Sequence, residues 1–321
     1  MNLIRPLLAV ASPSGSSARL SVLIFHRVLP VPDPVFPGEF DAVRFDQMLT
    51  WLRSAFNVLP LDEAIARART GSLPARAAAI TFDDGYADNC EIALPLLKKH
   101  GVSATFFVAT DFIDGGRMWN DSVIAAIRNC PSPVLDLSEL GLGQWAVATN
   151  SEKRQTIAGL LGKLKYLPHT ERLATVEALA AISGSELPDD LMMTGAQVRE
   201  LRSNGMVIGA HTCSHPILSS LDVEHARTEI NEGKRCLESL LGEPVSLFAY
   251  PNGKPGKDYR AEHVEIVREA GFDAAVSTAW GVLDKAVDFF QIPRFTPWDR
   301  TEMRFGYRML RNLFGAPAER V

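Results

Sequence analysis

The sequence predicts an α/β protein built on a parallel sheet that is either open or closed into a barrel. Three observations support this prediction. Short apolar runs alternate with amphipathic helical segments at least five times between residues 20 and 277. Polar residues follow several of these runs directly, at the strand ends where parallel sheets place their active sites. Apolar residues make up 46% of the 321-residue chain and charged residues 22%, which is enough for a large core.

The first half of the chain contains the first strands of this sheet. Apolar and β-branched runs predict strands at 20–25, 79–82 and 104–108. Apolar residues at helical spacing predict helices at 45–56, 61–69 and 86–100. His26 follows the first strand, and Asp83 and Asp84 follow the second. We therefore expect these three side chains to meet at one edge of the sheet.

The second half resumes the alternation after a long interruption. The stretch from about 115 to 195 is too long for a simple crossover and has helix-like segments, so we predict a helical insertion there. Further strands are predicted at 207–210, 245–250 and 274–277. Helices are expected at 196–204, 224–241 and 261–270.

The two ends of the chain are expected to lie outside the main domain, which we place at 19–298. Residues 7–11 are apolar, but the run is too short for a secretory signal, so we interpret 1–18 as a poorly ordered lead-in. Residues 299–321 predict a basic amphipathic helix. Arginines recur beside an apolar stripe, at Arg300, Arg304, Arg308 and Arg311 beside Met303, Tyr307, Leu310 and Phe314. This helix either packs on the barrel or contacts anionic lipid at the inner membrane face.

Composition excludes several classes of function. The net charge is −5 and there is no long basic block, which argues against a nucleic-acid partner. The four cysteines are widely spaced without a CxxC pair, as expected of reduced thiols in a cytoplasmic enzyme. No segment reaches the roughly 18–20 apolar residues of a membrane span.

Two polar clusters favour a divalent-metal site. Asp83 and Asp84 are adjacent like charges at a strand end, where they need a cation or a shared proton, unless they form a turn or helix cap. His211 and His215 follow a later strand and, at i and i+4, can point the same way on a helical turn. A carboxylate with two histidines is a common ligand set for a divalent ion.

These clusters resemble the motifs of the NodB-like polysaccharide deacetylases, metal-dependent hydrolases that remove acetyl groups from glycans. The first motif is similar to TFDDG at 81–85 and the second to HTCSH at 211–215. The resemblance covers roughly 20–110 and 195–298 and implies a distorted (β/α) barrel of about seven strands. It implies that Asp84, His211 and His215 bind the metal, with Zn²⁺ as the expected ion, and that Asp83 is the general base.

The chain departs from the family pattern at two places. The third motif lacks the arginine that orients the base, because Ala249 stands there; Arg294 is a candidate substitute, and the backbone N–H of Asn252 can still donate to an oxyanion. No late histidine is available as general acid, so we assign that role to His26. A family subset that acts on exopolysaccharide glucosamine polymers is similar in its early histidine and its Ala-Tyr-Pro motif. The alternative for His26 is a satisfied core histidine.

The expected substrate is an N-acetylated or O-acetylated glycan, in exopolysaccharide or cell-envelope metabolism. We expect Tyr250, Pro251 and Trp119 to bind it, although Trp119 could instead belong to the core of the insertion. A cytoplasmic location would favour a lipid-linked or nucleotide-linked precursor, with peripheral membrane contact through the C-terminal helix. The alternatives are a small-amide hydrolase on the same fold, a non-catalytic glycan-binding protein and a non-haem Fe(II) oxygenase, whose usual antiparallel jelly roll does not match.

Overall fold

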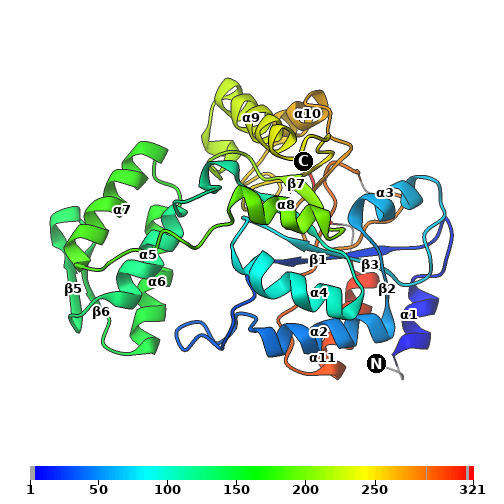
Figure 1. The fold of residues 1–321 in the computed structure, drawn as a ribbon, viewed down its shortest axis with the longest axis horizontal. Coiled ribbons are helices and arrows are strands. Elements are labelled where there is room, and N and C mark those ends of the chain that lie inside the picture. The colour runs from blue at the N-terminus through cyan, green and yellow to red at the C-terminus, as the bar shows by residue number, and fades with distance from the viewer. Residues whose placement is uncertain (1–3, 287, 316–317) are drawn as a thin grey trace.

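A parallel sheet forms the centre of the molecule in the computed structural model, which describes residues 4–286, 288–315 and 318–321 (Figure 1). Six strands follow one another in the order β1-β3-β4-β7-β8-β9, and β2 pairs with the start of β3. The strands are β1 Leu20–Phe25, β2 Asn57–Val58, β3 Ala77–Phe82, β4 Thr105–Val108, β7 Val207–Ala210, β8 Leu247–Ala249 and β9 Ala274–Val276. All pairs in this sheet are parallel, as the alternation of strands and helices predicts.

The extended segment 292–295 joins the two edges of the sheet. Ile292 bridges to Val276 of β9, and Phe295 bridges to Leu23 of β1, both in parallel. The Phe295 N–H donates to the carbonyl of Val22 at 2.7 Å, and the Ile24 N–H donates to the carbonyl of Phe295 at 3.0 Å. The strands therefore curl into a distorted barrel, which confirms the predicted fold class.

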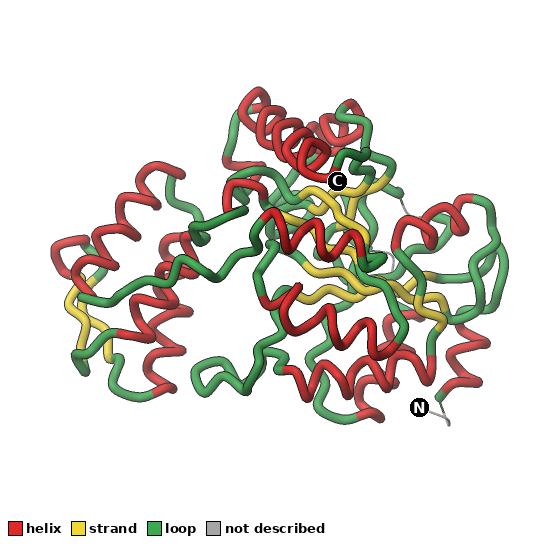
Figure 2. The backbone as a smooth tube through the Cα atoms, in the orientation of Figure 1, coloured by secondary structure: helices red, strands yellow, loops and turns green. Residues whose placement is uncertain are grey.

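Helices cover the outside of this barrel (Figure 2). They are α1 Arg5–Ala11, α2 Ala42–Ala55, α3 Leu61–Arg69, α4 Leu94–His100, α8 Gly195–Ser203, α9 Val223–Leu241, α10 Ala261–Glu269 and α11 Glu302–Leu313. Short helical turns lie at η1 Asn89–Ala93, η2 Thr110–Phe112, η3 Ser138–Leu140 and η4 Leu218–Ser220.

Side chains along each strand alternate between two cores, because successive residues of a strand point to opposite faces. In β3, Ile80 and Phe82 pack with the surrounding helices, whereas Ala79 belongs to the second core cluster, on the barrel side. Thr81 and Asp83 continue the same inward face as Ala79. The strand thus delivers Asp83 into the barrel at its carboxyl end.

The insertion forms a separate lobe, drawn in green in Figure 1. It contains three helices and an antiparallel hairpin, namely α5 Trp119–Asn129, β5 Val134–Leu137, β6 Gly143–Ala146, α6 Asn150–Leu164 and α7 His169–Ser183. Its apolar residues form a core of their own. Thr149 begins α6 with a reciprocal side-chain and backbone cap to Glu152. The helix-like segments predicted at 160–165 and 172–183 overlap α6 and α7, whereas α5 and the hairpin were not predicted.

The expectation of a poorly ordered lead-in is wrong for the described residues of 1–18; residues 1–3 lie outside the described part of the chain. Residues 5–11 form α1, with a proline in its first turn, where the missing N–H costs nothing. Leu8 is fully buried and joins the main core, and the Ser12 side chain bonds to the backbone of Arg19. Burial of Leu8 and Ala11 in the main core therefore stabilises a helix that the sequence pattern did not reveal.

The C-terminal helix α11 packs on the barrel through one apolar face. Phe305, Met309 and Leu313 are buried in the main core. Arg308, predicted on a solvated face, is also buried and bonds to Asp299 at 2.6 Å. Met303, Tyr307 and Phe314 stay exposed. In the part of the chain that the structure describes, none of the helices has the length and apolarity needed to cross a bilayer.

Candidate metal centre and its pocket

Four residues of the site adopt a left-handed backbone conformation that is rare outside glycine. Asp84 has φ 78°, Thr212 64°, His215 54° and Asn252 60°. Such outliers cost about 1–3 kcal/mol each and persist only where the surroundings impose them. The next residue, Gly85, has φ 93°, and a Cβ there would lie 2.9 Å from a methyl group of Val108. The surrounding structure therefore holds these loops in an unfavourable backbone conformation, which fixes the direction of their side chains.

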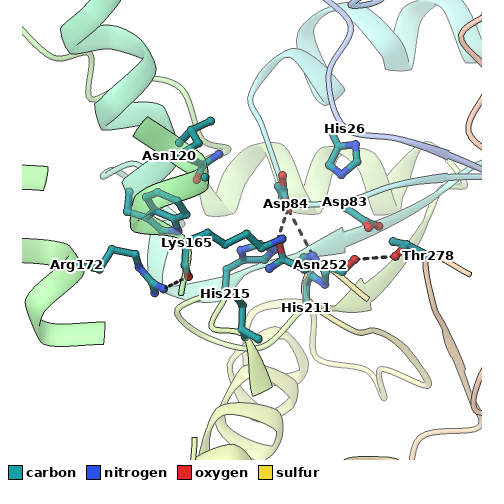
Figure 3. A pocket seen from close by; sticks show the side chains of 14 residues that line it. His26, Asp83, Asp84, Asn120, Lys165, Arg172, His211, His215, Asn252 and Thr278 are labelled. Carbon is teal, nitrogen blue, oxygen red and sulfur yellow. Dashed lines mark hydrogen bonds and ion pairs between the residues drawn. The ribbon is translucent and has the colours of Figure 1, made fainter. Parts of the chain in front are cut away.

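Asp84, His211 and His215 come together at the carboxyl ends of β3 and β7. One ligand atom from each residue lies within 4.8 Å of the others, and no other such group of three or more occurs among the described residues. Asp84 Oδ1 lies 3.4 Å from Nε2 of each histidine. Figure 3 shows both imidazoles turned toward this carboxylate. The structure thus assembles the three side chains that the resemblance implies as metal ligands.

The hydrogen bonds of His211 show that the cluster suits a cation. Its Nδ1 lies 2.7 Å from the carbonyl oxygen of Ala249, which can only accept, so Nδ1 carries the proton. The other nitrogen, Nε2, is buried and has no hydrogen-bond partner. A ring whose Nδ1–H is held by a carbonyl while Nε2 points at a carboxylate has the arrangement of a metal-bound histidine. The donor set therefore fits a divalent ion.

The pKa shifts of the cluster agree with this arrangement. Burial raises the pKa of Asp84, but contact with His211 and His215 outweighs burial and holds it well below the usual range. Burial lowers the pKa of His215 to about 4. Burial also lowers the pKa of His211, yet Asp84 and Asp83 more than compensate, so the net shift is upward. At neutral pH the carboxylate is ionised, and the site favours positive charge.

The loop between the two histidines is held against α9. The backbone N–H of Cys213 and the backbone N–H of Ser214 each donate to the Glu229 carboxylate at 2.9 Å. The Ser214 hydroxyl donates to the same carboxylate at 2.6 Å. Gly233 allows the helix to approach, because a Cβ there would lie 2.8 Å from the backbone of Thr212. Sequence reasoning missed Glu229, since a glutamate on an amphipathic helix carries no signal of its own.

Asp83 is paired with Arg294 inside the barrel. The two guanidinium Nη atoms donate to the two carboxylate oxygens at 2.6 Å each. Arg294 Nε donates to the carbonyl of Ser277 at 2.9 Å, which fixes the orientation of the fork. Burial raises the pKa of Asp83, but the charge of Arg294 outweighs it and lowers the pKa overall. The arginine predicted as a substitute therefore contacts the predicted base.

His26 is exposed at the end of β1, where it lines the pocket, so its alternative as a buried core histidine is wrong. Its backbone is anchored from the helical turn after the first motif. Asn89 donates to the carbonyl of His26 at 2.9 Å, and Asp88 accepts from the N–H of Val28 at 3.1 Å. The side chain is free to face the metal cluster while its main chain is fixed.

A cavity of about 370 Å³ lies over the cluster (Figure 3). Its lining consists of His26, Asp83, Asp84, Trp119, Asn120, Leu161, Gly162, Lys165, Arg172, His211, His215, Ile217, Asn252 and Thr278. The Thr278 hydroxyl donates to the carbonyl of Asn252 at 2.7 Å and fixes that turn. Trp119 lines the cavity and also packs against the core of the insertion lobe. It therefore has both of the positions considered for it, beside the substrate and in the core of the insertion.

A second cavity, of about 810 Å³, adjoins the first. It shares His26, Asp84 and Asn120 with it and runs between the loop after β1 and the lobe. Space is therefore available on two sides of the metal cluster, as an extended substrate requires.

Tyr250 and Pro251 do not line either cavity, so the prediction that they bind substrate is wrong for their side chains. Tyr250 is fully buried, stacks on Tyr259 at 3.9 Å and donates to the carbonyl of Phe290. The reason is strand alternation: Ala249 faces the barrel interior, so its neighbour must face the helices.

Apart from Trp119, the wall of the cavity that comes from the insertion lobe was not predicted. Asn120, Leu161, Lys165 and Arg172 come from α5, α6, α7 and the turn between the last two. No motif marks these residues, and their role depends on how the lobe folds over the barrel. The lobe thus completes the pocket.

A family model decides the family to which this barrel belongs. The model described as "Polysaccharide deacetylase" matches residues 70–141 and 165–275, together more than half of the chain. The chain belongs to the polysaccharide deacetylase family. The unmatched stretch between the two parts falls on β6 and α6 of the insertion lobe. The predicted resemblance is confirmed, and the chain is a hydrolase of this family rather than the alternative Fe(II) oxygenase.

Several known proteins are similar over most of the chain. YxkH of Bacillus subtilis (strain 168), named for the same family, is 20% identical over 279 residues, covering 86% of this chain and 71% of its own. The Streptococcus pyogenes deacetylase PplD in complex with acetate has a TM-score of 0.60 at 19% identity, covering 92% of this chain and 98% of its own. IcaB from Ammonifex degensii has a TM-score of 0.59 at 20% identity, covering 92% and 97%. These structures show that the deacetylase fold extends over nearly the whole chain.

Proposed function

We propose that this polysaccharide deacetylase uses a divalent ion to hydrolyse the acetamido group of an N-acetylated glycan. The observation that carries the proposal is the buried, unpartnered Nε2 of His211, which faces Asp84 while Nδ1 is held by a carbonyl. The early histidine His26 and the motif Ala249-Tyr250-Pro251, which are similar to those of a family subset acting on exopolysaccharide glucosamine polymers, support a substrate in exopolysaccharide metabolism.

Asp84, His211 and His215 would hold the ion, and Zn²⁺ suits two imidazoles and a carboxylate with open positions left for water and substrate. When bound there, the ion supplies a Lewis acid that polarises the acetyl carbonyl and makes a water more acidic. The chain's own residues then handle the protons and the developing charge.

Asp83 takes the proton of the attacking water in this mechanism. Arg294 keeps its carboxylate ionised and oriented by bonding to both oxygens. The backbone N–H of Asn252 donates to the carbonyl oxygen as it becomes negative. His26 gives a proton to the leaving nitrogen, so the carbon–nitrogen bond breaks to acetate and a free amine.

Metal analysis and acetate release test this proposal together. Purified protein should contain about one divalent ion per chain and release acetate from N-acetylglucosamine oligomers. Chelation should abolish release, and added Zn²⁺ should restore it. Release from small amides but not from oligomers would instead indicate the small-amide alternative.

Substitutions locate the ion. Asp84→Ala, His211→Ala and His215→Ala each remove one of three ligands and should reduce metal occupancy steeply. His225→Ala is a matched control, because this exposed histidine bonds to Asp222 at the N-terminus of α9 and lines neither cavity. Full occupancy in all three ligand variants would refute the assignment.

A further inference from the structure

The lobe side of the pocket carries two cations, Lys165 and Arg172 (Figure 3). Arg172 is only 4% exposed. Its Nη1 donates to the carbonyl of Lys165 at 3.1 Å, its Nη2 lies 3.3 Å from His169 Nδ1, and its guanidinium lies over the ring of Trp119. Its Nε is buried without any hydrogen-bond partner. No carboxylate of a described residue pairs with it.

Two other buried arginines show how unusual this is. Arg294 and Arg308 are likewise almost fully buried, and each bonds to a buried aspartate, Asp83 and Asp299. A buried guanidinium without an acid pays a large desolvation cost. Burial accordingly lowers the pKa of Arg172, with no acidic group acting in the opposite direction. The missing anion is therefore expected from outside the chain.

Lys165 adds a second unpaired cation beside Arg172. It follows α6 directly, lines the same cavity, and forms no ion pair with a described residue; its ammonium lies 5.6 Å from the ring centre of Tyr166. The acids that line the cavity, Asp83 and Asp84, follow β3 of the barrel rather than belonging to the lobe. One is neutralised by Arg294 and the other belongs to the metal cluster. The lobe wall is thus positive on a chain whose net charge is −5.

We propose that Lys165 and Arg172 form an anion subsite, so that the substrate is an anionic glycan with a carboxylate or phosphate close to the acetylated sugar. This inference rests on the proposed deacetylase function and names its substrate class. A guanidinium fork binds either anion through two N–H groups, and the neighbouring ammonium adds charge. The anion comes either from a uronic acid in the glycan or from a phosphate that links the glycan to a carrier.

A purely structural role for Arg172 makes a different prediction. If its contacts with Trp119 and the Lys165 carbonyl serve only to fix the turn between α6 and α7, its loss would weaken every ligand equally. An anion subsite, in contrast, discriminates between charged and neutral ligands of equal length. The ratio of their affinities is therefore the quantity to measure.

Three probes supply this ratio, with binding measured by calorimetry on the metal-loaded Asp83→Asn variant, which should not turn over. Chitotetraose is neutral, a hyaluronan tetrasaccharide carries carboxylates on alternate sugars, and UDP-N-acetylglucosamine carries a pyrophosphate. At low salt we expect at least one charged probe to bind roughly tenfold tighter than chitotetraose, as charge-assisted hydrogen bonds allow. The tighter of the two charged probes identifies the source of the anion.

Substitutions then test whether Lys165 and Arg172 cause the preference for charged probes. Lys165→Gln and Arg172→Gln should each reduce the affinity ratio about fivefold or more, and salt should reduce it in the parent protein. Lys163→Gln is the matched control, because this exposed lysine lies on the same helix outside the cavity and should leave the ratio unchanged. Lys165→Gln keeps the test valid if Arg172→Gln fails to fold.

The two proposals fail separately. Equal affinity for all three probes, or an equal loss for all three in the variants, would overturn the anion subsite even if acetate release is confirmed. Discrimination between the probes without acetate release from any glycan would overturn the proposed function and leave the subsite standing.

Discussion

Asp83 and Arg294 are separated by 211 residues in sequence and form a two-point ion pair inside the barrel, with both Nη–Oδ distances at 2.6 Å. Their side chains are almost completely buried. Ala249 stands where the family motif has its arginine, and its carbonyl instead holds His211. In the proposed mechanism, the guanidinium that orients the base therefore comes from the segment that closes the barrel.

Arg294→Gln should lower kcat for acetate release by roughly ten- to a thousandfold, since an unoriented base contributes less. Burial raises the pKa of Asp83, and the charge of Arg294 lowers it by more than burial raises it. Without Arg294 the effect of burial remains, so the pKa of Asp83 should rise. The base is then ionised only at higher pH, and the acidic limb of the kcat/KM profile should move upward. A pH–rate profile of both proteins measures this.

Arg308→Gln is a matched control, because it also removes one partner of a buried arginine–aspartate pair. Both variants should lose about 3–5 kcal/mol of unfolding free energy. Only Arg294→Gln should move the acidic limb. An unmoved limb in Arg294→Gln would show that the pair is structural.

The site residues that could be predicted lie in the few residues that follow a strand. Asp84, His211 and His26 occupy strand ends, and parallel strands bring such ends together whatever the rest of the fold does. Arg294 and its partner Asp83 were also predicted, from the arginine missing at Ala249 and from the position of Arg294 near a strand end, but the two-point geometry of the pair depends on how the barrel closes. Local sequence pattern and sheet topology thus determine which barrel residues meet in the site.

The remaining site residues depend on relations that a single sequence does not show. Tyr250 was assigned to the wrong face because a shift of one residue along a strand reverses its direction. Lys165 and Arg172 were missed because helices without motifs present them from another lobe. The α1 helix was missed because a helix of seven residues depends on tertiary contacts, here those of Leu8 and Ala11 with the main core.

His26→Ala should reduce release of acetate from an amide by about two to four powers of ten, because the leaving amine then lacks a proton donor. Hydrolysis of p-nitrophenyl acetate should be much less affected, because its leaving group departs without protonation. The comparison of the two substrates is the measurement. An equal loss for both, or a fall in melting temperature, would indicate that His26 only supports the loop.

Asp121 should make folding stability depend on pH. It is 5% exposed, accepts from the Tyr86 hydroxyl at 3.1 Å, and burial raises its pKa to about 6. Between about pH 4 and pH 6 the folded protein keeps a proton that the unfolded chain releases. Stability from this group is therefore lost as pH rises through that window, by about 3 kcal/mol at most.

Asp121→Asn removes this titration. Urea unfolding of the chelated protein at pH 5 and pH 7 should show a smaller difference in unfolding free energy for the variant than for the parent. Asp190→Asn, at an exposed carboxylate outside both cavities, should keep the parent difference. The same pH difference in Asp121→Asn and the parent would contradict the assignment.

We propose that the exposed face of α11 binds an anionic membrane surface. Met303, Tyr307 and Phe314 are 63–79% exposed, and Arg304 and Arg311 lie on the exposed side with them. On this proposal the protein should sediment with phosphatidylglycerol-containing vesicles at low salt and less at high salt. Each arginine near the surface contributes about 1 kcal/mol, so Arg304→Gln with Arg311→Gln should weaken binding substantially.

Removing the apolar contacts tests the same surface without deleting the helix, whose buried residues Phe305, Met309 and Leu313 support the barrel. Serine at Met303, Tyr307 and Phe314 should abolish most of the vesicle binding with little change in melting temperature. Serine at Val134, Ile182 and Val223 is the control, because these residues are also exposed and apolar but lie elsewhere. Equal partitioning of the two triple variants, or binding to neutral phosphatidylcholine vesicles alone, would show that α11 is only a packing element. Arg304 and Arg311 would then contribute to solubility only. The anion subsite of the lobe would bind a substrate that is free in solution.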